Sequence, residues 1–286
     1  MKIVAVSDTH IVPKGQASRG IDTAARLRLA LADLAENHGD AEFCVLCGDL
    51  ADHGDPDAYA HLAELLEGFP LPLKFMIGNH DHRANFIEAF PDAPLDVNGF
   101  VQSVADAEAG RFIFCDTYES GRVDGRMCAD RLTWLDERLA ERRDRPAYVF
   151  FHHPAWRNHG HTDAIRLTDA GKVARILKKY DHVRHLFAGH THRISSGVWN
   201  GVSFATLGAT HYNNGMPVVG LDAWPGRYHT PGYSTVILID DDQVVVHPNE
   251  FLHANEELDS SQFDPVALRK LLDAGGDLSV LQGHGD

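Results

Sequence analysis

The chain has 286 residues, of which 41 are acidic and 26 are basic, and its formal net charge at pH 7 is −15. This balance excludes a protein that holds nucleic-acid polymers by bulk electrostatics, because phosphate backbones need a basic surface. Hydrophobic residues make up 44% of the sequence, which excludes a disordered chain. No apolar run reaches the ~18–20 residues that span a bilayer, so we expect no stable membrane insertion. The apolar part of the first residues is too short for a signal peptide, and we expect a cytoplasmic protein.

The first eighty residues alternate strand-like apolar runs with amphipathic segments of helix length. The pattern predicts strands at Lys2–Ser7, Phe43–Cys47 and Leu73–Ile77, and helices at Ala24–Asn37 and Asp57–Glu67. A βαβαβ start of this kind indicates parallel strands joined by right-handed crossovers.

The pattern changes after about Asn98, where shorter strands become more frequent. We expect two further helices, at Asp130–Arg143 and Asp169–Lys179. The predicted strands in this part are Phe100–Ala105, Arg111–Asp116, Ala147–Phe151, His185–Ala188, Ile194–Trp199, Val202–Leu207, Tyr233–Ile239 and Gln243–His247. Together the elements predict an α/β fold in which two mixed sheets pack face to face with helices outside.

Two of the four cysteines, Cys44 and Cys47, lie in one strand-like run. Residues three apart on a strand point to opposite faces, so these two sulfurs should not meet. Redox motifs of this spacing usually sit at a helix N-terminus instead. We therefore expect buried, reduced thiols, in line with a cytoplasmic protein.

Polar clusters follow five of the predicted strands. They are Asp8-Thr9-His10, Gly48-Asp49-Leu50-Ala51-Asp52, Gly78-Asn79-His80-Asp81, His152-His153-Pro154 and Gly189-His190-Thr191-His192. The carboxyl ends of strands in open α/β sheets converge on one crevice, so these loops can bring their side chains together. Carboxylate, amide and imidazole groups without a thiolate favour a borderline metal such as Mn, Fe, Zn or Co.

In this order, the clusters resemble the pattern of the calcineurin-like metallophosphoesterase superfamily. That pattern is Asp-x-His, Gly-Asp-x-x-Asp, Gly-Asn-His-Asp/Glu, a His-bearing strand end and Gly-His-x-His. The resemblance covers residues 8 to 192, and its Gly-Asn-His-Asp and His-His-Pro sequences look most like the class III cyclic-nucleotide and glycerophosphodiester phosphodiesterases. It implies a four-layer αββα sandwich of two mixed β-sheets flanked by helices.

The resemblance also implies a dinuclear metal site. Its metal ligands would be Asp8, His10 and His192 for the first ion, Asn79, His152 and His190 for the second, and Asp49 as the bridge. In this family His80 would act next to the substrate phosphate, with Asp52 holding its tautomer. The family pattern favours His152 over His153 as the ligand.

Three further residues are candidates for substrate contact. His153 would face the pocket or support the ligands, and His211 opens the long loop Gly208–Gly232, a candidate pocket wall. Arg83 either binds a phosphate or faces solvent near the start of a helix.

The implied activity is that of a dinuclear-metal phosphoric diester hydrolase. Its substrates would be small organic phosphodiesters: cyclic nucleotides, glycerophosphodiesters or phospholipid headgroup esters. Two divalent ions, two aspartates and a bridging hydroxide carry a net charge of about +1, which attracts a diester monoanion, and the hydroxide would attack in line. The alternative is a phosphomonoesterase or pyrophosphohydrolase on the same dinuclear site.

The catalytic domain is expected at residues 1–247 and a polar extension at 248–286, with one short helix at Pro265–Asp273. The extension is a candidate cap or oligomer contact. Because enzymes that this chain resembles are often dimers or larger, we expect a homodimer or a higher homo-oligomer.

Overall fold

The computed structural model describes residues 1–215, 228–229, 232–252, 266, 269–270 and 273. The chain divides into two compact units, Met1–Leu252 and His253–Asp286. Much of the predicted loop Gly208–Gly232 and of the predicted helix Pro265–Asp273 lies outside the described residues. Those residues of the second stretch that are described, Arg269 and Lys270 among them, are helical.

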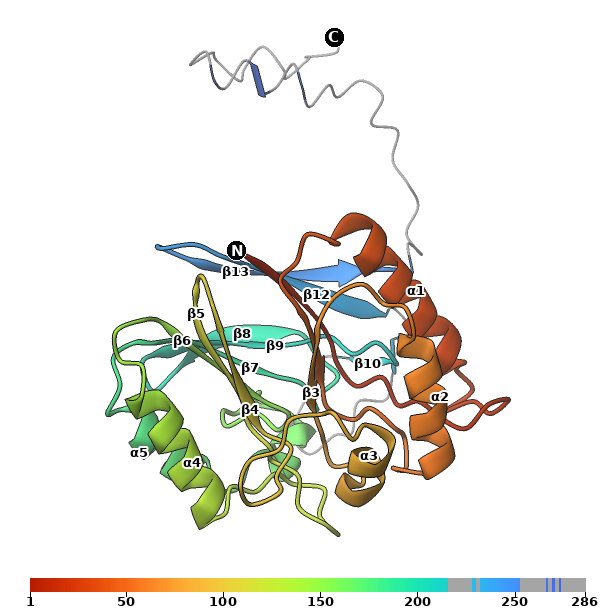
Figure 1. Cartoon of the computed structure of the whole chain (residues 1–286), viewed down its shortest axis with the longest axis horizontal. Helices are drawn as coiled ribbons and strands as arrows, with labels where there is room; N and C mark the ends of the chain where they lie inside the picture. Colours follow the sequence, from red (N-terminus) through yellow and green to blue (C-terminus); the bar gives the residue numbers. More distant parts are fainter. Residues whose placement is uncertain (216–227, 230–231, 253–265, 267–268, 271–272, 274–286) are drawn as a thin grey trace. The chain divides into compact units, whose positions relative to one another are not determined.

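A five-stranded sheet contains the N-terminal strands, in the order β13-β12-β1-β2-β3 (Figure 1). β1 (Lys2–Val6), β2 (Cys44–Cys47) and β3 (Leu73–Met76) are parallel. β12 (Tyr233–Ile239) pairs antiparallel with β1 and with β13 (Val244–Glu250). Apart from Lys2, the residues of β1 and β2 are apolar and almost fully buried, as expected for parallel strands covered on both faces.

A six-stranded sheet forms the second half of the first unit, in the order β4-β5-β6-β7-β9-β8. Its four inner strands are parallel, and the edge strands β4 and β8 run antiparallel to their neighbours. The strands are β4 (Ser103–Ala107), β5 (Gly110–Phe114), β6 (Ala147–Phe151), β7 (Val183–Ala188), β8 (Ser195–Trp199) and β9 (Val202–Thr206).

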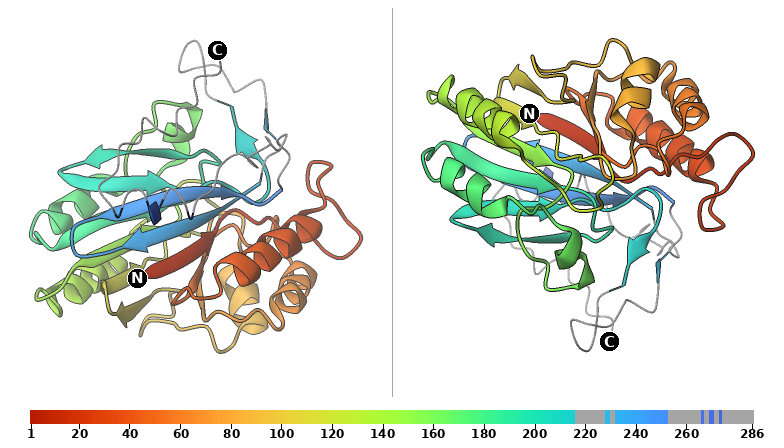
Figure 2. Two further views of the ribbon diagram at one scale, coloured as in Figure 1. Left: turned by 90° about the horizontal axis from the view of Figure 1, so that it is seen from above. Right: turned by 90° about the horizontal axis from the view of Figure 1, so that it is seen from below.

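Helices cover the outer faces of both sheets, and Figure 2 shows the two groups of helices on opposite sides of the first unit. Leu27, Leu31 and Leu34 of the first helix point inward, and the Asp22 carboxylate caps its start by accepting the Ala25 N–H. The helices are α1 (Thr23–Asn37), α2 (Pro56–Leu66) and α3 (Arg83–Ala89) on the first sheet, and α4 (Ala129–Ala140) and α5 (Ala170–Leu177) on the second. Smaller elements are the 3-10 helix η1 (His161–Ile165) and the short strands β10 (Asn213–Asn214) and β11 (Tyr228–His229).

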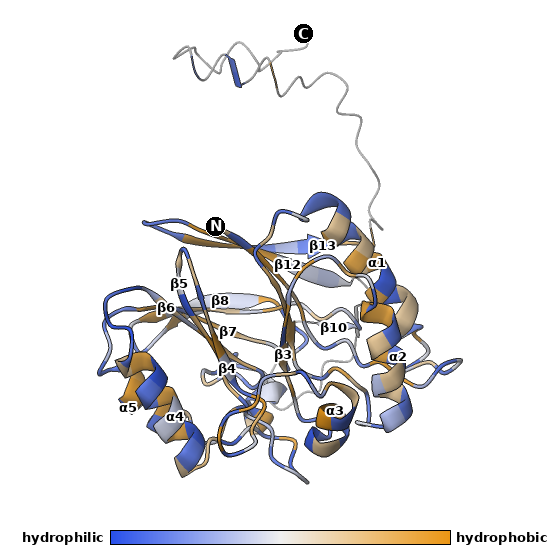
Figure 3. Ribbon diagram, viewed as in Figure 1, coloured by the Kyte–Doolittle hydropathy of each residue, from blue (hydrophilic) through white to orange (hydrophobic). Residues whose placement is uncertain are grey.

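Three apolar layers hold these elements together. Ile3 and Ile237 of the first sheet meet Phe112, Phe150 and Phe187 of the second between the sheets. One outer core lies between the first sheet and its helices, and another lies between the second sheet and its helices. In Figure 3 the helices alternate hydrophobic and hydrophilic stretches, whereas β6 is mostly hydrophobic. The predicted αββα sandwich of two mixed sheets is confirmed.

Several elements differ from their predicted bounds, among them β4, which begins at Ser103 rather than Phe100, and β7, which begins at Val183 rather than His185. Helix α3 begins at Arg83, where a helix start was expected, but its end was not predicted. Helix α4 ends at Ala140 rather than Arg143, since the next residues offer no apolar side chain to pack on the sheet. Strand β13 continues to Glu250, beyond the expected end at His247, and the buried Phe251 follows it.

All four cysteines are free, and Cys44, Cys47 and Cys115 are buried. Burial raises the pKa of the Cys44 thiol to about 12, so this group stays protonated and unreactive at neutral pH. None of the helices that the structure describes combines the length and the apolar composition that a membrane crossing requires.

Candidate metal centre

The loops that follow β1, β2, β3, β6 and β7 meet at the carboxyl ends of these strands. The Asp8 N–H donates to the Gly48 carbonyl at 3.1 Å, and the Gly189 N–H donates to the His152 carbonyl at 3.1 Å. The His190 N–H donates to the Asp8 carboxylate at 3.0 Å, which ties a loop of the second sheet to a loop of the first. The polar clusters at the strand ends are therefore brought to one place, as we expected.

Four side chains form a first group of potential ligands. Asp8, His10, Asp49 and His192 each offer a ligand atom, and these atoms all lie within 4.8 Å of one another. The Nε2 atoms of His10 and His192 face each other at 3.1 Å, and His192 Nε2 lies 3.4 Å from Asp8 Oδ1. One cation among these atoms would bind two nitrogens and two carboxylate oxygens, a donor set that suits a borderline metal.

A second group of potential ligands also lies next to Asp49. His152 Nε2 is 3.2 Å from Asp49 Oδ2, and His152, His153 and His190 form a cluster with ligand atoms within 4.8 Å. Asn79 Oδ1, His152 Nε2 and both ring nitrogens of His190 are buried without a hydrogen-bond partner among the described residues. Buried polar atoms of this kind need a partner, and a cation would supply it.

Hydrogen bonds fix the orientation of three imidazoles. The Nδ1 atom of His10 lies 2.9 Å from Asp52 Oδ1, and His152 Nδ1 lies 2.8 Å from the Cys47 carbonyl. His192 Nδ1 lies 2.8 Å from the Tyr212 carbonyl. Because these oxygens only accept, Nδ1 carries the proton in the neutral form of each ring, and Nε2 then has a lone pair for a metal.

The backbone of the site is turned into the left-handed region at five ligand candidates. Asp8, His10, Asp49, His190 and His192 have φ between 46° and 67°. Such conformations are uncommon outside glycine and persist only where the surrounding fold enforces them. The loops thus hold their side chains in place through the packing of the two sheets.

Two glycines leave room for these side chains. A Cβ atom on Gly48, whose φ is +83°, would collide with the His152 ring. A Cβ atom on Gly78 would collide with the Asp49 carboxylate and with the same ring. Glycine is therefore required at both positions for the backbone to approach the site.

The protonation states of Asp49, His190 and His192 suit a cation. Burial and neighbouring imidazoles lower the pKa of His190 and of His192 to about 3, so both rings are neutral at pH 7. Burial favours the neutral form of Asp49, but nearby imidazoles outweigh it and hold the pKa of Asp49 well below its usual range. Burial lowers the pKa of His152, but the Asp49 and Asp8 carboxylates outweigh it and raise this pKa to about 9, so without a metal this ring is protonated at pH 7 and loses that proton when a cation binds. A neutral imidazole and an ionised carboxylate are the forms that bind metals.

The contacts of His80 and Asp52 differ from the expectation. We expected the Asp52 carboxylate to orient His80, but His80 Nδ1 lies 3.8 Å from it and donates to the Asp52 backbone carbonyl at 2.7 Å. The carboxylate itself accepts from His10 Nδ1 and from Ser18 Oγ, the latter at 2.8 Å. Asp52 therefore orients His80 through its main chain and His10 through its side chain.

His153 and His211 lie beside the ligand candidates and are fully buried. His153 Nδ1 is 2.8 Å from Thr117 Oγ1, and the His153 ring lies 4.5 Å from the His190 ring. The His211 ring lies 5.0 Å from the His10 ring, and its Nε2 atom is 3.2 Å from the Ser18 carbonyl. Both rings are as deeply buried as the ligand candidates beside them, and neither lies on an open surface.

Arg83 is engaged elsewhere, which corrects its proposed contact with a phosphate. Its Nε and Nη2 atoms form a two-pronged ion pair with the fully buried Asp116 at 2.9 and 3.0 Å. The guanidinium also donates to the Tyr118 carbonyl and lies over the Phe100 ring. A pattern of charges in the sequence does not reveal this distant partner.

Replacing Arg83 by alanine is expected to lower the free energy of unfolding by about 2–4 kcal/mol, because it leaves a buried carboxylate short of its main partner. The KM for a phosphodiester should not change. Urea unfolding and initial-rate kinetics measure the two quantities, with Arg142→Ala at an exposed ion pair as the control. A normal stability together with a tenfold higher KM would restore Arg83 as a substrate ligand.

Asp81 has a structural role that the sequence reasoning missed, although this residue belongs to one of the quoted clusters. Its carboxylate is buried and accepts the backbone N–H groups of Leu50, Ala51 and Gly78, together with the Tyr59 hydroxyl. It thereby joins the loop after β2 to the loop after β3. The sequence feature that could have indicated this role is the acidic residue directly after the Asn79-His80 pair.

Replacing Asp81 by alanine should lower the free energy of unfolding by about 3 kcal/mol or more, because several buried donors lose their acceptor. Tyr59→Phe removes one of these hydrogen bonds and should cost about 1 kcal/mol. Urea unfolding of both variants, with the exposed Asp92→Asn as the control, gives the comparison. Equal stabilities for Asp81→Ala and Tyr59→Phe would contradict this role.

Residues 1–193 match the calcineurin-like phosphoesterase family, and the chain belongs to that family. A probable cyclic nucleotide phosphodiesterase from Rhodopseudomonas palustris is 35% identical over 275 residues, which are 95% of this chain and 99% of that protein. A cAMP/cGMP dual specificity phosphodiesterase from Mycobacterium tuberculosis is 29% identical over 96% of this chain and 86% of its own length. A dimetal phosphatase from Danio rerio shares the fold, with a TM-score of 0.65, 14% identity, and coverage of 87% of this chain and 96% of that one.

Proposed function

We propose that this chain is a metal-dependent phosphodiesterase that hydrolyses small organic phosphodiesters, with cyclic nucleotides as the first candidates. The observation that carries this proposal is the position of the Asp49 carboxylate. It lies 3.8 Å from His10 Nε2 in one group of ligand candidates and 3.2 Å from His152 Nε2 in the other. The relatives named as cyclic nucleotide phosphodiesterases, which match nearly the whole chain, support the same activity.

The residues present fit two divalent ions. The proposed ligands are Asp8, His10 and His192 for one ion, Asn79, His152 and His190 for the other, and Asp49 for both. When bound, such ions supply an activated nucleophile and positive charge beside the phosphate oxygens. We propose Mn, Fe, Zn or Co as the metals, because the donors are nitrogen and oxygen without a thiolate. Elemental analysis of the purified protein decides among them.

His80 is the proposed general acid. Its Nδ1–H donates to the Asp52 carbonyl, which leaves Nε2 for the substrate. The ring lines an open cavity of about 410 Å³ together with Tyr118, Ser120 and Arg122. When protonated, Nε2 can donate its proton to the leaving alkoxide oxygen, which is otherwise a poor leaving group. The His80 backbone N–H donates to Asp49 Oδ1 at 2.9 Å, which keeps the residue next to the ligand candidates.

Two substrates that differ in charge test the reaction class. The manganese-loaded protein should hydrolyse bis-p-nitrophenyl phosphate in preference to p-nitrophenyl phosphate. A strong preference for the monoester would overturn the proposal in favour of a phosphomonoesterase on the same site. A second panel of cyclic nucleotides, glycerophosphodiesters and lysophospholipids then identifies the substrate class.

Three further predictions belong to this proposal. We propose a catalytic domain at 1–247 with an extension at 248–286, an assembly of two or more copies, and a cytoplasmic location. Light scattering after size-exclusion chromatography measures the mass in solution. A mass of 31.6 kDa, that of one chain, would contradict the proposed assembly.

A further inference from the structure

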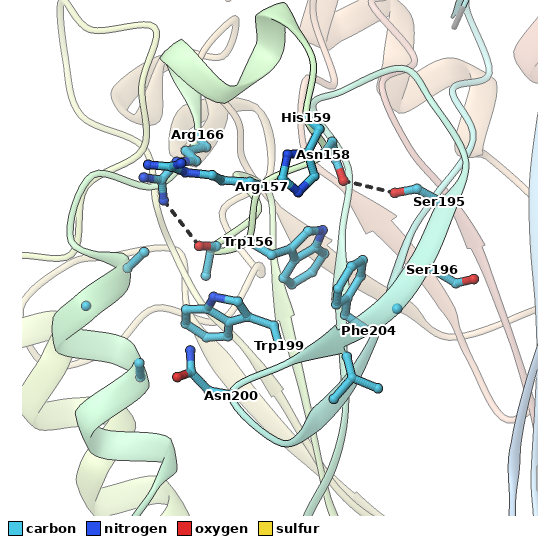
Figure 4. A pocket seen from close by; sticks show the side chains of 16 residues that line it. Trp156, Arg157, Asn158, His159, Arg166, Ser195, Ser196, Trp199, Asn200 and Phe204 are labelled. Atoms are coloured by element: carbon cyan, nitrogen blue, oxygen red, sulfur yellow. Dashed lines mark hydrogen bonds between the residues drawn. The ribbon is translucent and has the colours of Figure 1, made fainter. Parts of the chain in front are cut away.

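A second cavity lies on the outer face of the six-stranded sheet. It has a volume of about 720 Å³ and lies between helix α5, the β8–β9 hairpin and the loop that follows β6 (Figure 4). This volume is within the range of sites that bind small organic molecules. None of the metal-ligand candidates lines it, so it is a separate site from the metal centre.

Aromatic rings form much of its wall. The buried Trp156 ring stacks on the Phe204 ring at 4.3 Å with an interplanar angle of 19°. Gly197 pairs with Phe204 across the hairpin, and a Cβ atom at Gly197 would lie 2.9 Å from that ring. Trp199 is only partly buried, so its ring is available to a ligand. Planar rings favour stacking on a wall of this kind.

The cavity also carries positive charge. Its lining includes Arg157 and Arg166 and no acidic residue, although acids outnumber bases by 41 to 26 in the chain. Figure 4 shows the two arginines on one side of the cavity and the Trp156 and Phe204 rings on the other. Arg166 donates to the Ala155 carbonyl at 3.4 Å. Within the described part of the chain, neither guanidinium is in an ion pair with a carboxylate.

We propose that this cavity is a second binding site, for a nucleoside monophosphate. The planar base would stack against Trp199, and the phosphate would be bound by Arg157 and Arg166, whose forked donors match phosphate oxygens. Asn158 and Ser195, which hydrogen-bond to each other at 3.0 Å on the wall, would contact the ribose. Trp156 follows His152 by four residues, so an occupant of the cavity contacts the same loop that carries a proposed metal ligand.

Binding of 5′-AMP to the metal-free protein tests this proposal by calorimetry and by tryptophan fluorescence. We expect one bound AMP per chain and quenching that is reduced in Trp199→Phe. Arg157→Ala/Arg166→Ala should weaken binding roughly tenfold or more. Arg175→Ala, at an exposed position of α5 outside the cavity, should bind as the wild type does.

Adenosine and inorganic phosphate serve as half-ligands, and both should bind more weakly than AMP. The proposal is overturned if AMP fails to bind at millimolar concentration, or if the double arginine variant binds AMP as tightly as the wild type. It is also overturned if inorganic phosphate binds as tightly as AMP, since the rings would then contribute nothing. The readout is binding rather than turnover, so the proposed phosphodiesterase activity can fail while this site stands.

Discussion

Replacement of Asp49 by alanine is expected to remove both metal ions and to lower turnover by about 10³-fold or more, equivalent to roughly 4 kcal/mol. The reason is its position, because one carboxylate serves both groups of ligand candidates. Replacement of any other ligand candidate would first remove only the one ion that this residue is proposed to bind. Elemental analysis gives the metal content, and hydrolysis of bis-p-nitrophenyl phosphate gives the turnover.

Asp40→Ala is the matched control for this prediction. Asp40 is exposed and pairs with Lys2 on the surface, so this variant should keep both ions and full activity. Circular dichroism confirms that both variants fold. If Asp49→Ala retained two ions per chain and a turnover within a few-fold of the wild type, the proposed shared ligand would be wrong.

Replacement of His80 by alanine should leave the metal content intact and lower kcat by about 10²–10⁴-fold, the usual contribution of a general acid. The ring donates through Nδ1 to a backbone carbonyl, and its exposed side lines the open cavity beside the ligand candidates. A substrate with p-nitrophenolate as its leaving group needs less protonation, so the loss should be smaller for it than for an alkyl diester. This difference separates proton donation from a general loss of structure.

His53→Ala provides the comparison for His80. His53 lies in the same cavity wall, but it is largely exposed and its Nε2 atom is 3.6 Å from the Asp52 carboxylate. We expect a much smaller effect on kcat in this variant. A His80→Ala protein that lost its metal and kept the same activity per bound ion would show that His80 supports the metals instead.

The architecture could be predicted from the sequence because it depends on local patterns. Strand β12 has the predicted bounds Tyr233–Ile239, since an apolar run between two turns determines both of its ends. The polar clusters could be found in the same way, because each directly follows such a run. Their convergence follows from a general rule for parallel strands rather than from any detail of this chain.

The partners of single side chains could not be predicted, because they depend on contacts between distant segments. Arg83 looked available for a phosphate until the fold placed the buried Asp116 next to it. The Asp52 carboxylate contacts His10, 42 positions earlier, and no local pattern distinguishes this choice from His80. The cavity beside Trp156 is likewise formed by a loop, a helix and a hairpin that no sequence motif connects.

The left-handed backbone conformation of five ligand candidates limits which residues can replace them. They are Asp8, His10, Asp49, His190 and His192. Aspartate and histidine adopt this backbone conformation more often than most other residues do. Each of these positions therefore favours such a residue for two reasons, its donor atom and its main-chain conformation. A valine or isoleucine there would strain the loop as well as remove a donor. After a chelator removes the ions, the loops should therefore keep their conformation and bind metal again without refolding. Replacement of one metal by another should be far easier than replacement of one ligand residue by another.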